Sequence, residues 1–217
     1  MDSQIIIPIL GFAAFIVTLT AHEFSHALGG FLLGDETAKR YGRLTLNPLA
    51  HIDPIGTILI PLIGTLGGIP LIGWAKPVPF NPYNLKHGKW GAVIVSLAGP
   101  FANLVVATLA MLLTLLVTGP MGLMPDNLLV IFLSYLVMVS LALAVFNLLP
   151  VPPLDGSRLL HVILASPKHR NLLIFLETRG PLILLLAIFL DFSTGGHVLG
   201  AIFGTVFSAF FWLFGVR

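Results

Sequence analysis

The chain has no cysteine and few charged residues. Without cysteine it can form no disulfide, and a zinc site would have to be built from His, Asp and Glu. Asp, Glu, Lys and Arg make up 9% of the sequence, against about 25% in soluble domains. Hydrophobic residues make up 57%, and the mean hydropathy is +1.00. These values exclude an ordinary soluble domain and predict an integral membrane protein with several spans.

The chain also lacks any polar stretch of the roughly 50 residues that a further domain would need. We therefore expect a single domain over residues 1–217. Its core should cover about residues 5–165, and C-terminal helices should follow at about 167–217.

Long apolar runs define the expected elements. They predict an all-α polytopic membrane protein with about five to six transmembrane segments around a three-helix core. The clearest spans are residues 5–33, 91–117 and 127–149. Residues 171–190, interrupted by Gly180-Pro181, predict an interfacial helix that leads into a short span, and residues 198–214 predict the last span.

A small membrane-associated β and re-entrant loop region is expected between the first two spans. Residues 54–73 are apolar but repeatedly interrupted by Gly and Pro, which favours a bent or re-entrant segment over one regular crossing helix. Before it, Arg43-Leu44-Thr45-Leu46 alternates polar and apolar residues and stops at Asn47-Pro48, which predicts a short strand.

The basic residues predict the topology. If residues 54–73 return to the side they left, the lysines and arginines of the loops all fall on one side of the membrane. The positive-inside rule then places those loops in the cytoplasm and the N-terminus outside, in the cell (inner) membrane. The pI of 9.2 accordingly indicates loops that face an anionic lipid surface, and no nucleic-acid partner is expected.

The motif with the clearest chemistry is His22-Glu23-Phe24-Ser25-His26, an H-E-x-x-H pattern inside the first apolar run. At 3.6 residues per turn the two histidines share one helix face, where their imidazoles can bind one zinc ion. Glu23 is placed to take a proton from a water molecule at the metal. Ionisable residues inside a membrane helix cost roughly 2.5–3.5 kcal/mol on insertion scales, so their presence indicates function.

Two histidines need a third protein ligand. Topology separates the candidates, because Asp191 and His197 would lie at the opposite membrane face and Glu177 can be a rim charge near Arg179. Asp155 is favoured, since it follows the third span in a segment that its prolines keep from continuing as a helix. The full set of candidates is His51, Asp53, Asp155, His161, Glu177, Asp191 and His197.

Three motifs in this order resemble the site-2 protease family of intramembrane zinc metalloproteases. They are the His22–His26 motif, Ala98-Gly99-Pro100-Phe101-Ala102-Asn103, and the run from Asn147 to Leu154-Asp155-Gly156. The resemblance covers most of residues 10–165. It is closest to compact prokaryotic members, because no insertion large enough for a PDZ domain and no nucleotide-binding tail is expected.

The resemblance implies a zinc-dependent endopeptidase that cleaves peptide bonds in or near transmembrane segments of membrane-protein substrates, with its active site opening toward the cytoplasm. His22, His26 and Asp155 would bind one Zn²⁺ per chain. Glu23 would act as general base and later as acid, and Asn147 would donate to the substrate carbonyl or oxyanion.

Further residues are expected to bind substrate or to orient a metal ligand. Asn103 could bind substrate or support helix packing, and the edge formed by Arg43, Leu44, Thr45 and Leu46 could hold an unwound substrate by strand addition. His51 and Asp53 could orient a metal ligand, although structuring their own loop is the alternative we favour.

Two other functions remain open at this stage. Intramembrane His, Glu and Asp also occur in metal or proton transporters. An inactive relative acting as a scaffold is the third possibility, but such a protein would have no need of Glu23.

Overall fold

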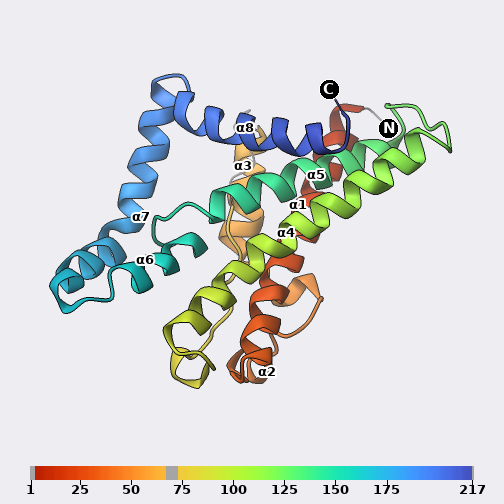
Figure 1. Cartoon of the computed structure of the whole chain (residues 1–217). Helices are drawn as coiled ribbons and strands as arrows, with labels where there is room; N and C mark the ends of the chain where they lie inside the picture. Colours follow the sequence, from red (N-terminus) through yellow and green to blue (C-terminus); the bar gives the residue numbers. More distant parts are fainter. Residues whose placement is uncertain (1–2, 67–72, 217) are drawn as a thin grey trace. The chain divides into compact units, whose positions relative to one another are not determined.

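The computed structural model describes residues 3–66 and 73–216, and within this part all regular structure is helical (Figure 1). The chain forms two compact units, Met1–Ser140 and Leu141–Arg217. The prediction of an all-α protein is therefore confirmed for the described residues. The single domain with a core at about 5–165 stays a prediction.

The first unit is built on α1 (Ser3–Leu32) and α4 (Lys89–Thr118), which pack extensively against each other (Figure 1). Their backbones approach closely because Gly29 of α1 has no side chain: an added Cβ would lie 3.3 Å from the Cβ of Ala98. Small residues at such crossings are the usual means of packing helices within a membrane.

The third long helix, α5 (Leu128–Asn147), begins in the first unit. Its Ser140 hydroxyl lies 2.9 Å from the hydroxyl of Thr18 on α1, and both side chains are fully buried. This hydrogen bond joins two otherwise apolar helix faces and fixes the position of α5 beside α1.

Four helices of the described chain are long and apolar enough to cross a membrane: Ile5–Leu32, Lys89–Thr118, Leu128–Asn147 and Pro167–Ser193. The last helix, α8 (His197–Leu213), has 17 residues, at the lower limit of the 17–25 residues that a crossing helix uses. The expected number of five to six transmembrane segments is therefore not confirmed by length and composition.

The break expected at Gly180-Pro181 is wrong, since α7 (Arg170–Ser193) continues through it. A proline inside a helix removes one hydrogen bond, whereas ending the helix in an apolar environment would leave several backbone groups without partners. Gly180 serves packing instead, because an added Cβ would lie 2.6 Å from the carbonyl oxygen of Pro152.

The two ends of the interrupted apolar segment lie close together. A π-helical stretch, η2 (Pro54–Leu59), leads into the short α3 (Ile60–Leu66), and residues 67–72 lie outside the described part. On return, the amide of Trp74 donates to the carbonyl of Gly56 (3.1 Å), and the Thr57 hydroxyl donates to the carbonyl of Trp74 (2.8 Å). These hydrogen bonds hold Trp74 beside Gly56 and Thr57. Re-entry of residues 54–73 into the membrane stays a prediction.

The short strand expected over residues 43–46 is wrong, because these residues form a bend. The buried Arg43 guanidinium donates to the carbonyl of Ala50, and the carbonyl of Thr45 accepts a hydrogen bond from the His51 ring (2.9 Å). The carbonyl of Thr45, which would face a neighbouring strand, is thus bonded to a side chain of its own loop.

The connecting loops of the first unit meet around Asp35, which follows α1. Its carboxylate accepts from the amide of Asn81 (2.7 Å), the side chain of Asn84 (3.1 Å) and the hydroxyl of Thr37 (2.6 Å) at the start of α2 (Thr37–Arg40). Burial by itself would raise the pKa of Asp35, but these hydrogen bonds outweigh it and lower the pKa. The end of α1 and the approach to α4 therefore lie together.

Two short helices complete these loops, η1 (Pro48–Ala50) and η3 (Pro82–Asn84). In the second unit, η4 (Asp155–Ser157) and α6 (Arg158–Ile163) follow the end of α5. They lead through η5 (Pro167–His169) to α7 and α8.

Candidate metal centre

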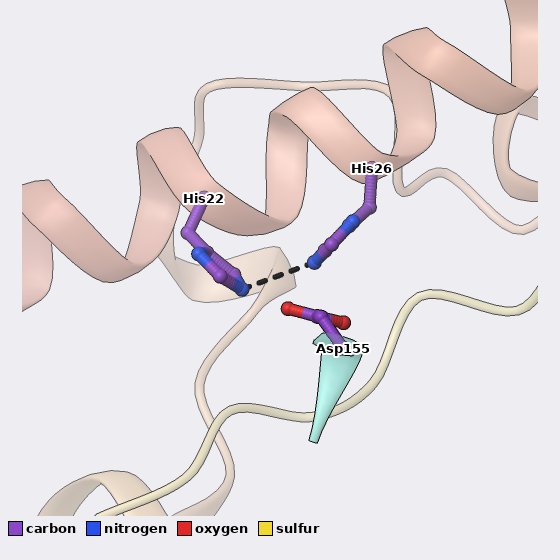
Figure 2. A group of neighbouring side chains, drawn as sticks. All are labelled: His22, His26 and Asp155. Atoms are coloured by element: carbon purple, nitrogen blue, oxygen red, sulfur yellow. Dashed lines mark hydrogen bonds between the residues drawn. The ribbon is translucent and has the colours of Figure 1, made fainter. Parts of the chain in front are cut away.

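The two histidines of the H-E-x-x-H motif lie on one face of α1, as their spacing predicts. Their Nε2 atoms are 3.0 Å apart, and both residues are buried, with exposed fractions of 5% for His22 and 9% for His26. Figure 2 shows the imidazoles extending from the same side of the helix, with the facing nitrogens joined by a dashed line.

This pair fits a metal ion. Zn²⁺ binds imidazole nitrogens at about 2.0–2.1 Å in a tetrahedral arrangement, which places two such nitrogens about 3.3 Å apart. The observed separation of the Nε2 atoms is a few tenths of an ångström shorter. Small rotations of the two rings would open the pair enough to receive the ion.

A glycine of α4 makes room for the two rings. An added Cβ on Gly99 would overlap Nε2 of His26 and would lie 2.7 Å from Cε1 of His22. Any larger residue at this position would occupy the space in which the imidazoles lie. The Ala98–Asn103 motif therefore contributes directly to the site through its glycine.

The remaining ring nitrogens are bonded to α4. Nδ1 of His26 lies 2.8 Å from the carbonyl oxygen of Val95, and Nδ1 of His22 lies 3.0 Å from Nδ2 of Asn103. Metal-binding histidines usually have such partners, which orient the ring and select its tautomer. Val95 carries no signal in the sequence, because a backbone carbonyl can belong to any residue.

Glu23 is the only Asp or Glu in α1 and is 8% exposed. It follows His22 directly, so α1 holds its carboxylate at the same level of the membrane as the histidines. A carboxylate at this position can accept a proton from a water molecule beside the two rings and release it later.

The second unit contains the other two residues expected at the active centre. Asp155 begins η4, and Figure 2 also draws it. The turn before it is compact, since an added Cβ on Gly156 would overlap the carbonyl of Leu148 just beyond α5. Asn147 ends α5, and its Nδ2 donates to the carbonyl of Leu143 (3.0 Å). Their roles at a metal stay predictions.

His51 and Asp53 bond their own loop. The His51 ring is hydrogen-bonded to the carbonyl of Thr45, and the residue is 1% exposed. Burial lowers the pKa of His51, and the charge of the nearby Arg43 lowers it further. Asp53 accepts from the amides of Ile55 (3.0 Å) and Gly56 at the start of η2. These contacts agree with the loop-structuring alternative, and a role for either residue at the metal stays a prediction.

The residues expected to hold substrate differ in accessibility. Asn103 and Arg43 are buried, with exposed fractions of 0% and 7%, whereas Leu46 is 63% exposed and Leu44 and Thr45 are half-buried. Asn103 lies against His22, and its expected role in binding substrate stays a prediction.

Comparison with known proteins identifies relatives that align with two thirds or more of the chain. Residues 116–188 match the model of peptidase family M50. “Putative zinc metalloprotease YwhC” of Bacillus subtilis (strain 168) is 43% identical over 148 residues, which are 67% of this chain and 64% of that protein.

Two further relatives are named “Putative zinc metalloprotease Rip2”. The protein of Mycobacterium tuberculosis (strain H37Rv) is 32% identical over 192 residues, 88% of this chain and 70% of that protein. The protein of Mycolicibacterium smegmatis is 38% identical over 149 residues, 68% of this chain and 54% of that protein. The chain thus spans slightly less than two thirds of the Bacillus protein and about half of the Mycolicibacterium one. No solved structure matches the chain significantly.

Proposed function

Because the chain belongs to peptidase family M50, the site-2 protease family, we propose that it is a zinc-dependent intramembrane endopeptidase. The four long apolar helices make it a multi-pass membrane protein. The main structural support for this function is the pair of buried histidines on α1, whose Nε2 atoms face each other and which flank Glu23 in the sequence.

We assign the metal to His22, His26 and Asp155, one zinc ion per chain. The histidines supply two neutral nitrogens from one helix face. Asp155 supplies a carboxylate from the turn after α5, in the Leu154-Asp155-Gly156 motif. When bound, zinc supplies Lewis acidity and lowers the pKa of water.

Glu23 carries the proton transfers in this mechanism. Its carboxylate accepts a proton from the attacking water and then gives it to the leaving amine nitrogen. The Asn147 side chain donates a hydrogen bond to the carbonyl oxygen of the substrate as negative charge develops on it. For this step its Nδ2 uses the proton that does not bond Leu143, so the helix bond can orient the amide.

The substrates proposed are transmembrane segments of other proteins. A helical peptide bond is shielded by its own turns, so the segment must unwind locally before Glu23 and its water can reach it. The interrupted apolar segment of residues 54–73 is the candidate gate for substrate entry.

We propose that the basic loops face the cytoplasm in the cell (inner) membrane, with the N-terminus outside. The hydrogen bonds of Trp74 with Gly56 and Thr57 support this arrangement, because they keep the loops before and after the apolar segment together. All loop lysines and arginines then share that side, as the positive-inside rule requires.

A metal or proton transporter is less well supported. A path for ions would need ionisable side chains through both halves of the membrane. In the described helices, α5 and the part of α4 after Lys89 contain no Asp, Glu, His, Lys or Arg. The ionisable residues of α1 are confined to residues 22–26.

Cleavage of single-span membrane proteins by the purified chain in liposomes tests this function. We compare the wild type with Glu23→Gln and quantify zinc in both. We expect zinc in both proteins and cleavage only in the wild type, with the rate of Glu23→Gln reduced at least 100-fold. Cleavage by Glu23→Gln at the wild-type rate would rule out the assignment of the base.

A further inference from the structure

We propose that Asn103 is a positioning residue for the metal centre: its amide oxygen accepts a hydrogen bond from Nδ1–H of His22 and so directs the Nε2 lone pair of that ring to the metal. This inference rests on the proposed function. Asn103 on α4 would thus set the tautomer and the orientation of His22 on α1, and it would not need to contact the substrate.

The position of Asn103 suits this role. The side chain is fully buried, and its amide nitrogen lies 3.0 Å from Nδ1 of His22. Its oxygen is also buried and has no hydrogen-bond partner among the described residues. A buried amide oxygen without a hydrogen bond destabilises the folded protein. The opposite orientation of the amide would give this oxygen a partner.

The other histidine defines the tautomer that a metal needs. Nδ1 of His26 faces the carbonyl oxygen of Val95, which can only accept, so this nitrogen carries the proton and Nε2 has the lone pair. For His22 to bind the same ion, its Nε2 must also have the lone pair. The proton of His22 must then be on Nδ1, and its partner there must be an acceptor.

Asn103 can supply either partner, because a half-turn of its amide exchanges the nitrogen and the oxygen. With the nitrogen toward His22, the contacts form a chain in which His22 donates from Nε2 to His26. With the oxygen toward His22, both Nε2 atoms carry lone pairs, as zinc coordination requires. The second orientation is the one that holds the metal-binding tautomer.

The register of the helices explains why this residue has the role. Val95, Gly99 and Asn103 follow one another at intervals of four residues, so they share one face of α4. They contact, in order, His26, both imidazoles and His22. One face of α4 therefore supplies an acceptor for each ring and the space between them.

The zinc affinities of two variants distinguish a role of Asn103 in positioning His22 from a role in helix packing alone. Asn103→Leu keeps the number and branching of the side-chain heavy atoms but has neither donor nor acceptor. Asn103→Asp keeps the acceptor and is closer in shape. If Asn103 only fills space between apolar helices, leucine should be tolerated and a buried carboxylate should be harmful. If it orients His22, the order reverses, since a carboxylate is the usual partner of a zinc-bound histidine.

We therefore measure the zinc dissociation constant of the full chain in detergent by chelator competition. We expect Asn103→Leu to weaken zinc binding about 10–100-fold and Asn103→Asp to bind as tightly as the wild type or more tightly. Thr114→Val is the matched control on α4, because its hydroxyl bonds only the carbonyl of Ala110 in its own helix. It should leave zinc affinity unchanged.

Zinc binding by Asn103→Leu equal to that of Thr114→Val would overturn the inference, as would binding by Asn103→Asp weaker than that of the wild type. If Asn103→Leu does not fold, as judged by size-exclusion chromatography, Asn103→Asp alone decides by the same criterion. Absence of zinc from the wild type would instead contradict the proposed function, so the two failures are distinguishable.

Discussion

At the scale of single residues, the centre combines local and distant contributions. The pairing of His22 and His26 could be predicted because four residues of one helix determine it. The contact between His22 and Asn103 joins residues 81 positions apart, and the sequence alone could not place those side chains together. Gly99 belongs to one of the three sequence motifs, but only the structure shows that it lies against the two imidazoles.

Gly99→Ala should damage the metal centre. The added methyl would overlap Nε2 of His26, so one or both rings must turn away from the shared position. Overpacking of this kind costs about 1–3 kcal/mol, and we expect zinc affinity to fall about tenfold or more by chelator competition. Gly204→Ala is the control, because its Cβ would enter open space. Equal zinc affinity of the two variants would contradict the geometry described for Gly99.

At the scale of elements, apolar run length predicted the long helices well, because backbone groups in lipid must bond within their own segment. The same principle explains the error at Gly180-Pro181, where a continuous helix keeps more backbone hydrogen bonds than a break would. The strand expected at residues 43–46 failed for a different reason. Alternation predicts a strand only where a partner is present, and here Arg43 and His51 bond the loop itself.

The hydrogen bond between Thr18 and Ser140 should couple α1 to α5. A double-mutant cycle with Thr18→Val and Ser140→Ala should give a coupling energy of about 0.6 kcal/mol, typical of buried side-chain bonds in membrane proteins. Unfolding in mixed micelles measures it. Thr114→Val with Ser134→Ala is the comparison cycle, since each hydroxyl bonds its own helix and additive effects are expected. A coupling energy of zero in the first cycle would show that this bond does not stabilise the pair.

At the scale of the whole molecule, the proposed topology depends on whether residues 54–73 re-enter the membrane. The interruption of residues 54–73 by Gly and Pro indicated re-entry, and hydrogen bonds between its two ends support it. The amide of Lys86 also donates to the carbonyl of Leu33 (2.9 Å), so the end of α1 and the start of α4 are joined. The distribution of lysine and arginine favours the same topology, in which all basic loops share one side of the membrane.

The absence of native cysteine allows a clean test of the topology. Lys39→Cys and Lys86→Cys, both at exposed positions between α1 and α4, should react with a membrane-impermeant maleimide only after cells are permeabilised. Met124→Cys, between α4 and α5, should react with intact cells, since α4 crosses the membrane. Labelling of residues 39 and 86 from opposite sides of the membrane would contradict re-entry of residues 54–73.

The central claim is a single zinc ion held by His22, His26 and Asp155. X-ray absorption spectroscopy of the zinc-loaded full chain tests it most directly, because the spectrum reports the kind and number of ligands. We expect one zinc per chain with two imidazole ligands at about 2.0–2.1 Å and the remaining ligands oxygen. Asp155→Ala should keep the imidazole signal and weaken zinc binding. A spectrum with fewer than two imidazoles, or no bound zinc, would contradict the account.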